Sequence, residues 1–64
     1  RGFEAPIEVV NGIGTVRGKR LREVGAESML ALAALPPEHT AEITGVSVEM
    51  ATRFRDDAIE RLRR

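Results

Sequence analysis

The sequence predicts a small all-α domain. Apolar residues recur at helical spacing, glycine and proline divide the chain into short segments, and no stretch alternates apolar and polar residues for long enough to form a strand. The chain has 64 residues, and a domain of this length buries only about 60% of the surface that its unfolded form exposes. With no cysteine and a single histidine, we expect a small core held by packing alone.

The first two of five expected short helices flank a glycine-rich turn. One covers residues 6–10, where Pro6 suits a helix start because its missing N–H would have no partner there. Two glycines then force a tight turn over residues 11–14, since glycine allows positive φ and close approach of the backbone. The next helix covers residues 15–24, with Gly25 as its C-terminal stop.

Three further helices are expected after this stop. One over residues 28–35 is capped by Ser28 and is apolar nearly all round, which predicts a central place in the core. Another covers residues 37–44. The longest runs from about residue 48 to residue 63, with Ser47 as its N-cap. The buried stripe of this last helix is expected to comprise Ala51, Phe54, Ala58 and Leu62.

The charges balance overall but not locally. Ten Lys and Arg face ten Asp and Glu, for a net charge of zero with His neutral. Residues 11–25 carry a net charge of +3 from four basic residues and one acidic residue, whereas residues 26–50 carry −4 from four Glu. A neutral domain lacks the field of a strong non-specific nucleic-acid binder, but a local basic patch can still position a phosphate. An anion site is therefore expected near residues 17–22.

An internal repeat relates the two halves of the chain. Residues 12–21 read GIGTVRGKRL and residues 45–54 read GVSVEMATRF, so that position 12 pairs with position 45 and each later pair keeps this offset. Each copy has a glycine, an aliphatic residue, a small residue, three variable positions, a second small residue, and a large apolar residue three positions later. We therefore expect two related units to pack around the helix over residues 28–35.

This pattern resembles the helix-hairpin-helix motif. Two copies joined by a helix resemble the double helix-hairpin-helix domain of DNA-repair nucleases, recombinase N-terminal domains and helicase C-termini. The resemblance implies a single domain over residues 1–64, with motif one at about 7–25, a connecting helix at about 28–35 and motif two at about 37–63. Ser47 departs from the family pattern, which often has a second glycine there. The family implies sequence-independent DNA binding by an accessory domain in DNA repair or recombination.

The first hairpin is the expected phosphate site. Its turn directs the N–H groups from about Gly14 to Val16 outward at a helix start, where unpaired donors and the positive end of the helix dipole attract an anion. Such contacts position a protein on nucleic acid without reading its sequence. The expected DNA-binding residues are Gly12, Ile13, Gly14, Thr15, Val16, Arg17, Lys19 and Arg20. By resemblance alone, the hairpin carbonyls can also hold a monovalent cation; no other cofactor is expected.

The second hairpin is expected to bind more weakly or to be purely structural. Glu49 would repel a phosphate, and Ser47 can itself satisfy one of the donors at the helix start. The candidate residues of this hairpin are Gly45, Val46, Ser47, Val48 and Arg53. The sequence thus predicts an asymmetric pair of hairpins.

The candidate binding residues also have simpler, purely structural interpretations. The glycines of the first turn can serve packing only, the basic residues of segment 17–22 can form an ordinary solvated face, and Ile13 and Val46 are most simply core residues. His39 is expected at the surface, and Thr40, which stands where the resemblance implies an aliphatic residue, is expected to loosen the packing of its helix. The terminal basic side chains, expected to be frayed, are Arg61, Arg63 and Arg64.

Several functional classes are disfavoured. No apolar run approaches the roughly 18 residues of a membrane span, and no signal sequence opens the chain. Asp56 and Asp57 point about 100° apart on a helix and so do not converge on one metal ion. No P-loop lysine and hydroxyl occur, and no nucleophile stands beside a base, so no enzyme is expected. The chain reads as intracellular, and Arg1 in place of Met indicates a fragment or a processed product.

The sequence therefore predicts a non-enzymatic module that contacts phosphates of duplex or single-stranded DNA with low affinity on its own. The alternative is the same fold used for protein–protein interaction or dimerisation, with the acidic residues of segment 26–50 facing a basic partner. Other domains of a parent protein are further candidate partners. Neutral net charge, Glu49 and the altered second hairpin favour this alternative.

Overall fold

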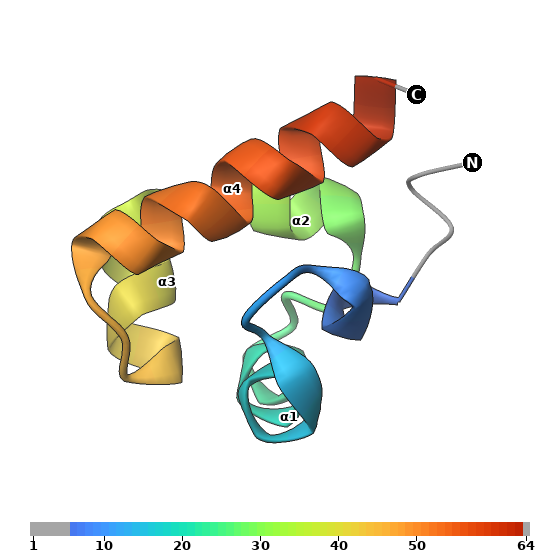
Figure 1. Ribbon diagram of the computed structural model, residues 1–64. Helices are drawn as coiled ribbons and strands as arrows, with labels where there is room; N and C mark the ends of the chain where they lie inside the picture. Colours follow the sequence, from blue (N-terminus) through green and yellow to red (C-terminus); the bar gives the residue numbers. More distant parts are fainter. Residues whose placement is uncertain (1–5, 64) are drawn as a thin grey trace.

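Helices form the framework of the computed structural model, which describes residues 6–63 (Figure 1). In chain order they are a 3-10 turn η2 (Ile7–Val9), α1 (Gly14–Glu23), α2 (Met29–Ala34), α3 (Pro37–Thr44) and α4 (Val48–Arg63). α4 packs against α2 and α3, while α1 packs against α3 and η2. No strand occurs among the described residues, so the predicted all-α class is confirmed.

The prediction of five helices is wrong at the first segment. Residues 7–9 form one 3-10 turn, closed by hydrogen bonds of 3.1 Å from Val9 N to Pro6 O and from Val10 N to Ile7 O. Pro6 and Val10 are both extended, with ψ of 148° and 128°. The segment is β-branched at Ile7, Val9 and Val10 and is too short to repay the cost of starting an α-helix. Within residues 6–63 there are therefore four α-helices.

The remaining helix ends follow the predicted caps. Ser28 Oγ accepts a hydrogen bond from Ala31 N at 3.0 Å, and Ser47 Oγ accepts one from Met50 N at 3.1 Å. Gly25 follows α1 with a φ of 86°, as a C-terminal stop requires. These three caps explain why α2 and α4 begin, and why α1 ends, close to the residues that the sequence indicates.

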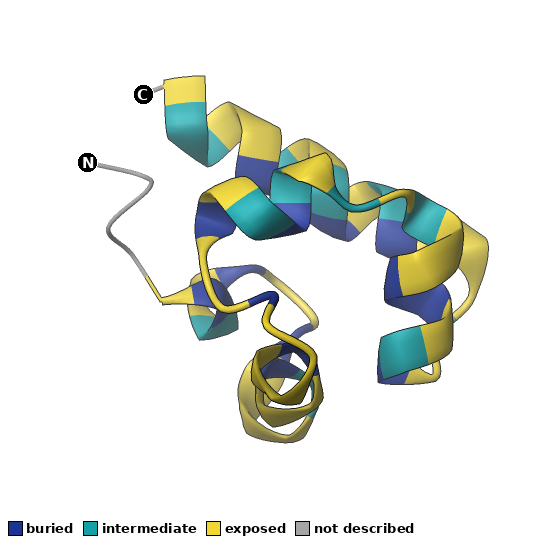
Figure 2. Ribbon diagram, turned by 180° about the vertical axis from the view of Figure 1, so that it is seen from behind, coloured by how far each residue is buried: buried dark blue, intermediate teal, exposed yellow. Residues whose placement is uncertain are grey.

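One apolar cluster fills the space that the helices enclose, and the buried residues lie on their inner sides (Figure 2). Its buried members are Ile7, Val10, Ile13, Leu21, Ala26, Met29, Leu32, Phe54 and Ala58. α2 is less central than predicted: Leu32 is fully buried, but Leu30 is 65% exposed. The expected stripe on α4 is buried at Ala51, Phe54 and Ala58, while Leu62 is only partly buried.

Thr40 on α3 was expected to loosen the packing, yet it is only 1% exposed. In the repeat it corresponds to Ile7, which is fully buried in the other half of the chain. Its Oγ1 has no hydrogen-bond partner. Thr44 Oγ1, by contrast, donates to Thr40 O at 2.7 Å. Thr40 therefore occupies a core position with an unsatisfied hydroxyl, which costs stability because the group has left water without a replacement partner.

Replacing Thr40 by valine should stabilise the protein. Thr40→Val keeps the shape of the side chain and removes the unsatisfied hydroxyl, so we expect the free energy of unfolding to rise by about 1 kcal/mol. Denaturant unfolding followed by circular dichroism measures the change. The matched control is Thr44→Val, which loses a buried hydrogen bond and should lower the free energy of unfolding by about 1 kcal/mol. A loss of stability in Thr40→Val would show that its hydroxyl has a partner.

Candidate functional site

The first tip, residues 11–14, has two positions with a backbone conformation that glycine adopts readily and other residues rarely do. Gly12 and Gly14 have φ of 98° and 62°. A Cβ on Gly12 would also lie 2.9 Å from Cε1 of Phe54, so α4 packs directly against this residue. Gly14 has open space around it, so its backbone conformation alone demands glycine. The packing interpretation of the tip glycines thus holds for Gly12, whereas Gly14 serves the turn at the start of α1.

The start of α1 presents unpaired amides. Ile13 N donates to Val10 O at 3.1 Å, and Ile13, the N-cap, offers no capping side chain. Among the described residues, the amides of Gly14, Thr15 and Val16 have no hydrogen-bond acceptor. These three residues are exposed. Three N–H groups and the positive end of the α1 dipole therefore face solvent together.

The second tip, residues 45–47, has a different helix start. Gly45 has a φ of 75° and corresponds to Gly12 in the repeat, but Ser47 has no positive φ where Gly14 does. The hydroxyl of Ser47 caps Met50 N, as predicted. Glu49 in the first turn of α4 adds an exposed negative charge. The second tip thus leaves fewer donors available and places a carboxylate beside them.

A shallow groove of about 620 Å³ joins the two tips. Its lining comprises Gly12, Ile13, Gly14, Thr15, Val16, Arg17, Arg20, Thr44 and Gly45. Arg20 reaches toward the second tip, since a Cβ on Gly45 would lie 3.7 Å from its Nη1. Lys19, predicted with the same cluster, does not line the groove. Lys19 and Arg20 make no ion pair with any described residue.

Arg17 turns back onto the first tip. Its Nη1 donates to Gly12 O at 2.6 Å, a charge-assisted hydrogen bond to the carbonyl of the turn. The guanidinium thus holds the carbonyl where the family resemblance implies a monovalent cation, and Gly12 O does not fit a further cation in this arrangement. Arg17 is also one of the residues that line the groove.

Arg22, the last of the basic cluster, is engaged with the neighbouring turn. Its Nε and Nη2 donate to the two carboxylate oxygens of Glu8 at 3.0 and 2.7 Å. A Cβ on Gly18 would lie 2.5 Å from Oε2 of Glu8, so the small residue of the repeat makes room for this carboxylate. The hydrogen bonds that Arg22 donates to Glu8 lower the pKa of Glu8 and raise the pKa of Arg22. Arg22 therefore ties η2 to α1 and is not available to a ligand.

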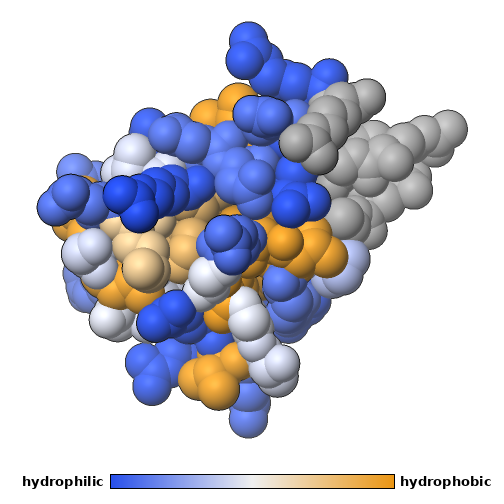
Figure 3. Space-filling model, viewed as in Figure 1, coloured by the Kyte–Doolittle hydropathy of each residue, from blue (hydrophilic) through white to orange (hydrophobic). Residues whose placement is uncertain are grey.

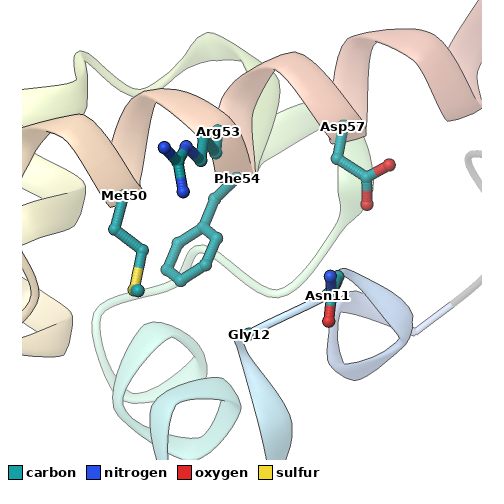
Figure 4. A pocket seen from close by; sticks show the side chains of 6 residues that line it. All are labelled: Asn11, Gly12, Met50, Arg53, Phe54 and Asp57. Carbon is teal, nitrogen blue, oxygen red and sulfur yellow. The ribbon is translucent and has the colours of Figure 1, made fainter.

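A hollow of about 400 Å³ lies on the other side of the first tip, between the tip and α4. Asn11, Gly12, Met50, Arg53, Phe54 and Asp57 line it, as Figure 4 shows. Arg53, which the sequence assigned to the second hairpin, thus lies beside the first tip. Figure 3 shows apolar surface at the centre of this face, between the hydrophilic side chains of α4 and α1. The sequence interpretation missed Asn11 and Asp57 because it considered Asn11 only as part of the tight turn and Asp57 only as a metal ligand.

The end of α4 makes contacts that the prediction of frayed side chains did not include. Arg61, expected to be frayed, donates from Nε to Asp57 Oδ2 at 3.0 Å and from Nη2 to Val9 O at 3.1 Å. It therefore ties α4 to the end of η2. Arg63 is exposed, and Arg64 lies outside the described residues. His39 is exposed, as predicted, and Val46 is partly buried against the core.

In the part of the chain that the structure describes, no three His, Asp or Glu side chains gather as a metal-binding group. No helix over residues 6–63 is both long and apolar enough to cross a membrane. Comparison of the chain with known protein families, with characterised proteins and with solved structures finds no match.

The Glu8–Arg22 pair should make the free energy of unfolding depend on pH in the acidic range. Because the pKa of Glu8 lies below its ordinary 4.5 in the folded state, the pair contributes stability above that pH and loses it as the pH falls through the lowered value. Glu8→Gln lacks this contribution. We expect the free energy of unfolding to fall less in Glu8→Gln than in the wild type between about pH 6 and about pH 3.

The matched control for this measurement is Glu42→Gln on α3, an exposed carboxylate with no ion pair among the described residues. This variant should follow the pH profile of the wild type. Identical profiles for Glu8→Gln and the wild type would contradict a stabilising role for the pair.

Proposed function

We propose that the protein is a sequence-independent DNA-binding module that holds a backbone phosphate at the start of α1. The observation that carries the proposal is the uncapped helix start, where the amides of Gly14, Thr15 and Val16 face solvent without acceptors among the described residues. A phosphate oxygen accepts such N–H groups, and its charge is stabilised by the helix dipole. Contacts of this kind go to the DNA backbone and carry no sequence information.

The charge distribution around the first tip supports the same ligand. Arg17 and Arg20 line the groove, and Arg20 has no ion pair among the described residues. Arg17 is held on Gly12 O by one nitrogen, which fixes its guanidinium close to the amides. A guanidinium matches the oxygens of a phosphate through several parallel donors. Amides and guanidinium groups together favour a phosphate over a neutral ligand.

The resemblance of the sequence to the double helix-hairpin-helix domain also supports the proposal, since those domains bind DNA through such tips. The second tip is the weaker phosphate site because Ser47 caps its helix and Glu49 adds a negative charge. The first tip is therefore the stronger contact. With about two to four phosphates neutralised, the logarithm of the affinity should fall with the logarithm of the salt concentration at a slope of roughly −2 to −4.

Charge reversal at Arg20 should weaken DNA binding more than the same change at Lys19. Both residues are exposed on α1 and differ in position, since only Arg20 lines the groove. We expect Arg20→Glu to lower the affinity for a short duplex by about tenfold or more. Lys19→Glu should lower the affinity less, because it changes the net charge of the protein without removing a contact in the groove. Fluorescence anisotropy with a labelled duplex over a salt series measures both variants.

Two results would contradict the proposal. Equal losses in the two variants would place the contact outside the groove. If the wild type retains no DNA even at low salt, the module does not bind DNA, and the protein-interaction alternative becomes the better account.

A further inference from the structure

The hollow beside the first tip has the chemistry of a site for a single base. We propose that it accepts one unpaired nucleobase of a DNA strand whose phosphate lies at the start of α1. This inference rests on the proposed function and adds the strand type to it: the preferred DNA has an unpaired nucleotide. A base within a duplex cannot enter such a hollow because its polar edge is paired and its faces are stacked.

The two sites lie on either side of one residue. Gly12 lines both the groove at the start of α1 and the hollow against α4. A nucleotide that binds across the first tip can therefore place its phosphate in the groove and its base in the hollow. Arg53 on α4 is exposed, lines the hollow and has no ion pair among the described residues, so it can meet a neighbouring phosphate.

The size and the apolar lining suit a planar ring. The volume of about 400 Å³ falls in the range of roughly 300–1,000 Å³ that is common for pockets of small organic ligands. Phe54 is 1% exposed and so closes the floor without offering its ring face for stacking. Met50, which is 36% exposed, supplies the apolar contact, and its thioether is a favourable neighbour for an aromatic ring.

The polar lining suits the edge of a base. Asp57 and Asn11 face each other across the opening (Figure 4). Asp57 Oδ2 accepts from Arg61, which leaves Oδ1 as an acceptor for the hollow, and the Asn11 amide has no partner among the described residues. Each unpaired base can donate to such a carboxylate, cytosine, adenine and guanine through an exocyclic amino group and thymine through its N3–H. The hollow therefore suits any unpaired base, and cytosine serves as the probe.

The test compares DNA molecules that differ only in one base. The full chain is titrated onto a blunt duplex, the same duplex with one unpaired cytosine, and the same duplex with an abasic nucleotide at that place. We expect the unpaired cytosine to raise the affinity roughly fivefold or more over the blunt duplex, since a net hydrogen bond and a thioether–ring contact each have about this magnitude. The abasic nucleotide, which keeps the phosphate, should give no gain.

Two variants of equal charge change locate the effect. In Asp57→Asn, Arg61 keeps the side-chain oxygen as its acceptor, so the new amino group faces the hollow and opposes the amino group of cytosine. Asp56→Asn is the matched control, because Asp56 is 64% exposed, lies next in sequence and does not line the hollow. Only Asp57→Asn should lose the gain from the unpaired cytosine. Circular dichroism of both variants checks that each is folded.

The possible failures are distinguishable. If the wild type binds the blunt duplex but gains nothing from the unpaired cytosine, or if the gain survives in Asp57→Asn, the base site is wrong while the phosphate site stands. If the abasic nucleotide gives the same gain as cytosine, the preference comes from a flexible backbone and the base site is again wrong. If no DNA binds at low salt, the proposed function and the base site both fail.

Discussion

The contact between Gly12 and Phe54 is the constraint on which the arrangement of the first tip depends. Phe54 is the largest fully buried side chain of the protein as described, and its ring occupies the place where a side chain on residue 12 would lie. The contact brings the first tip against α4, although the two segments are far apart in the sequence. Gly12 lines both the hollow against α4 and the groove at the start of α1.

The two halves of the chain share one sequence pattern, but their tips differ in how the helix start is satisfied. Gly12 and Gly45, which correspond in the repeat, both have positive φ, and the corresponding pair Leu21 and Phe54 are both buried. The third position of the pattern separates them. Gly14 adopts a positive φ and leaves its helix uncapped, whereas Ser47 keeps a negative φ and caps its own helix. A single side chain thus decides whether a tip keeps its amides for a ligand or satisfies one of them internally.

Local signals in the sequence predicted most of the fold. Caps at Ser28 and Ser47, and helical spacing on α4, indicate the elements correctly because short-range hydrogen bonds and one-sided burial determine them. The contacts that shape the site are long-range, and the sequence does not indicate them. Neither the contact of Arg61 with Val9 O, 52 residues away, nor the position of Arg53 beside the first tip follows from any spacing rule. The first segment was predicted as a helix because Pro6 suits a helix start, but three β-branched residues in five favour a single 3-10 turn.

The central claim is that the amides at the start of α1 receive a phosphate, and NMR of the ¹⁵N-labelled protein tests it most directly. On titration with a short blunt duplex at low salt, we expect the amide signals of Gly14, Thr15 and Val16 to shift most. The amide of Met50, which Ser47 caps, should shift little. Shifts that spare the three amides of α1, or that centre on the second tip, would contradict the account.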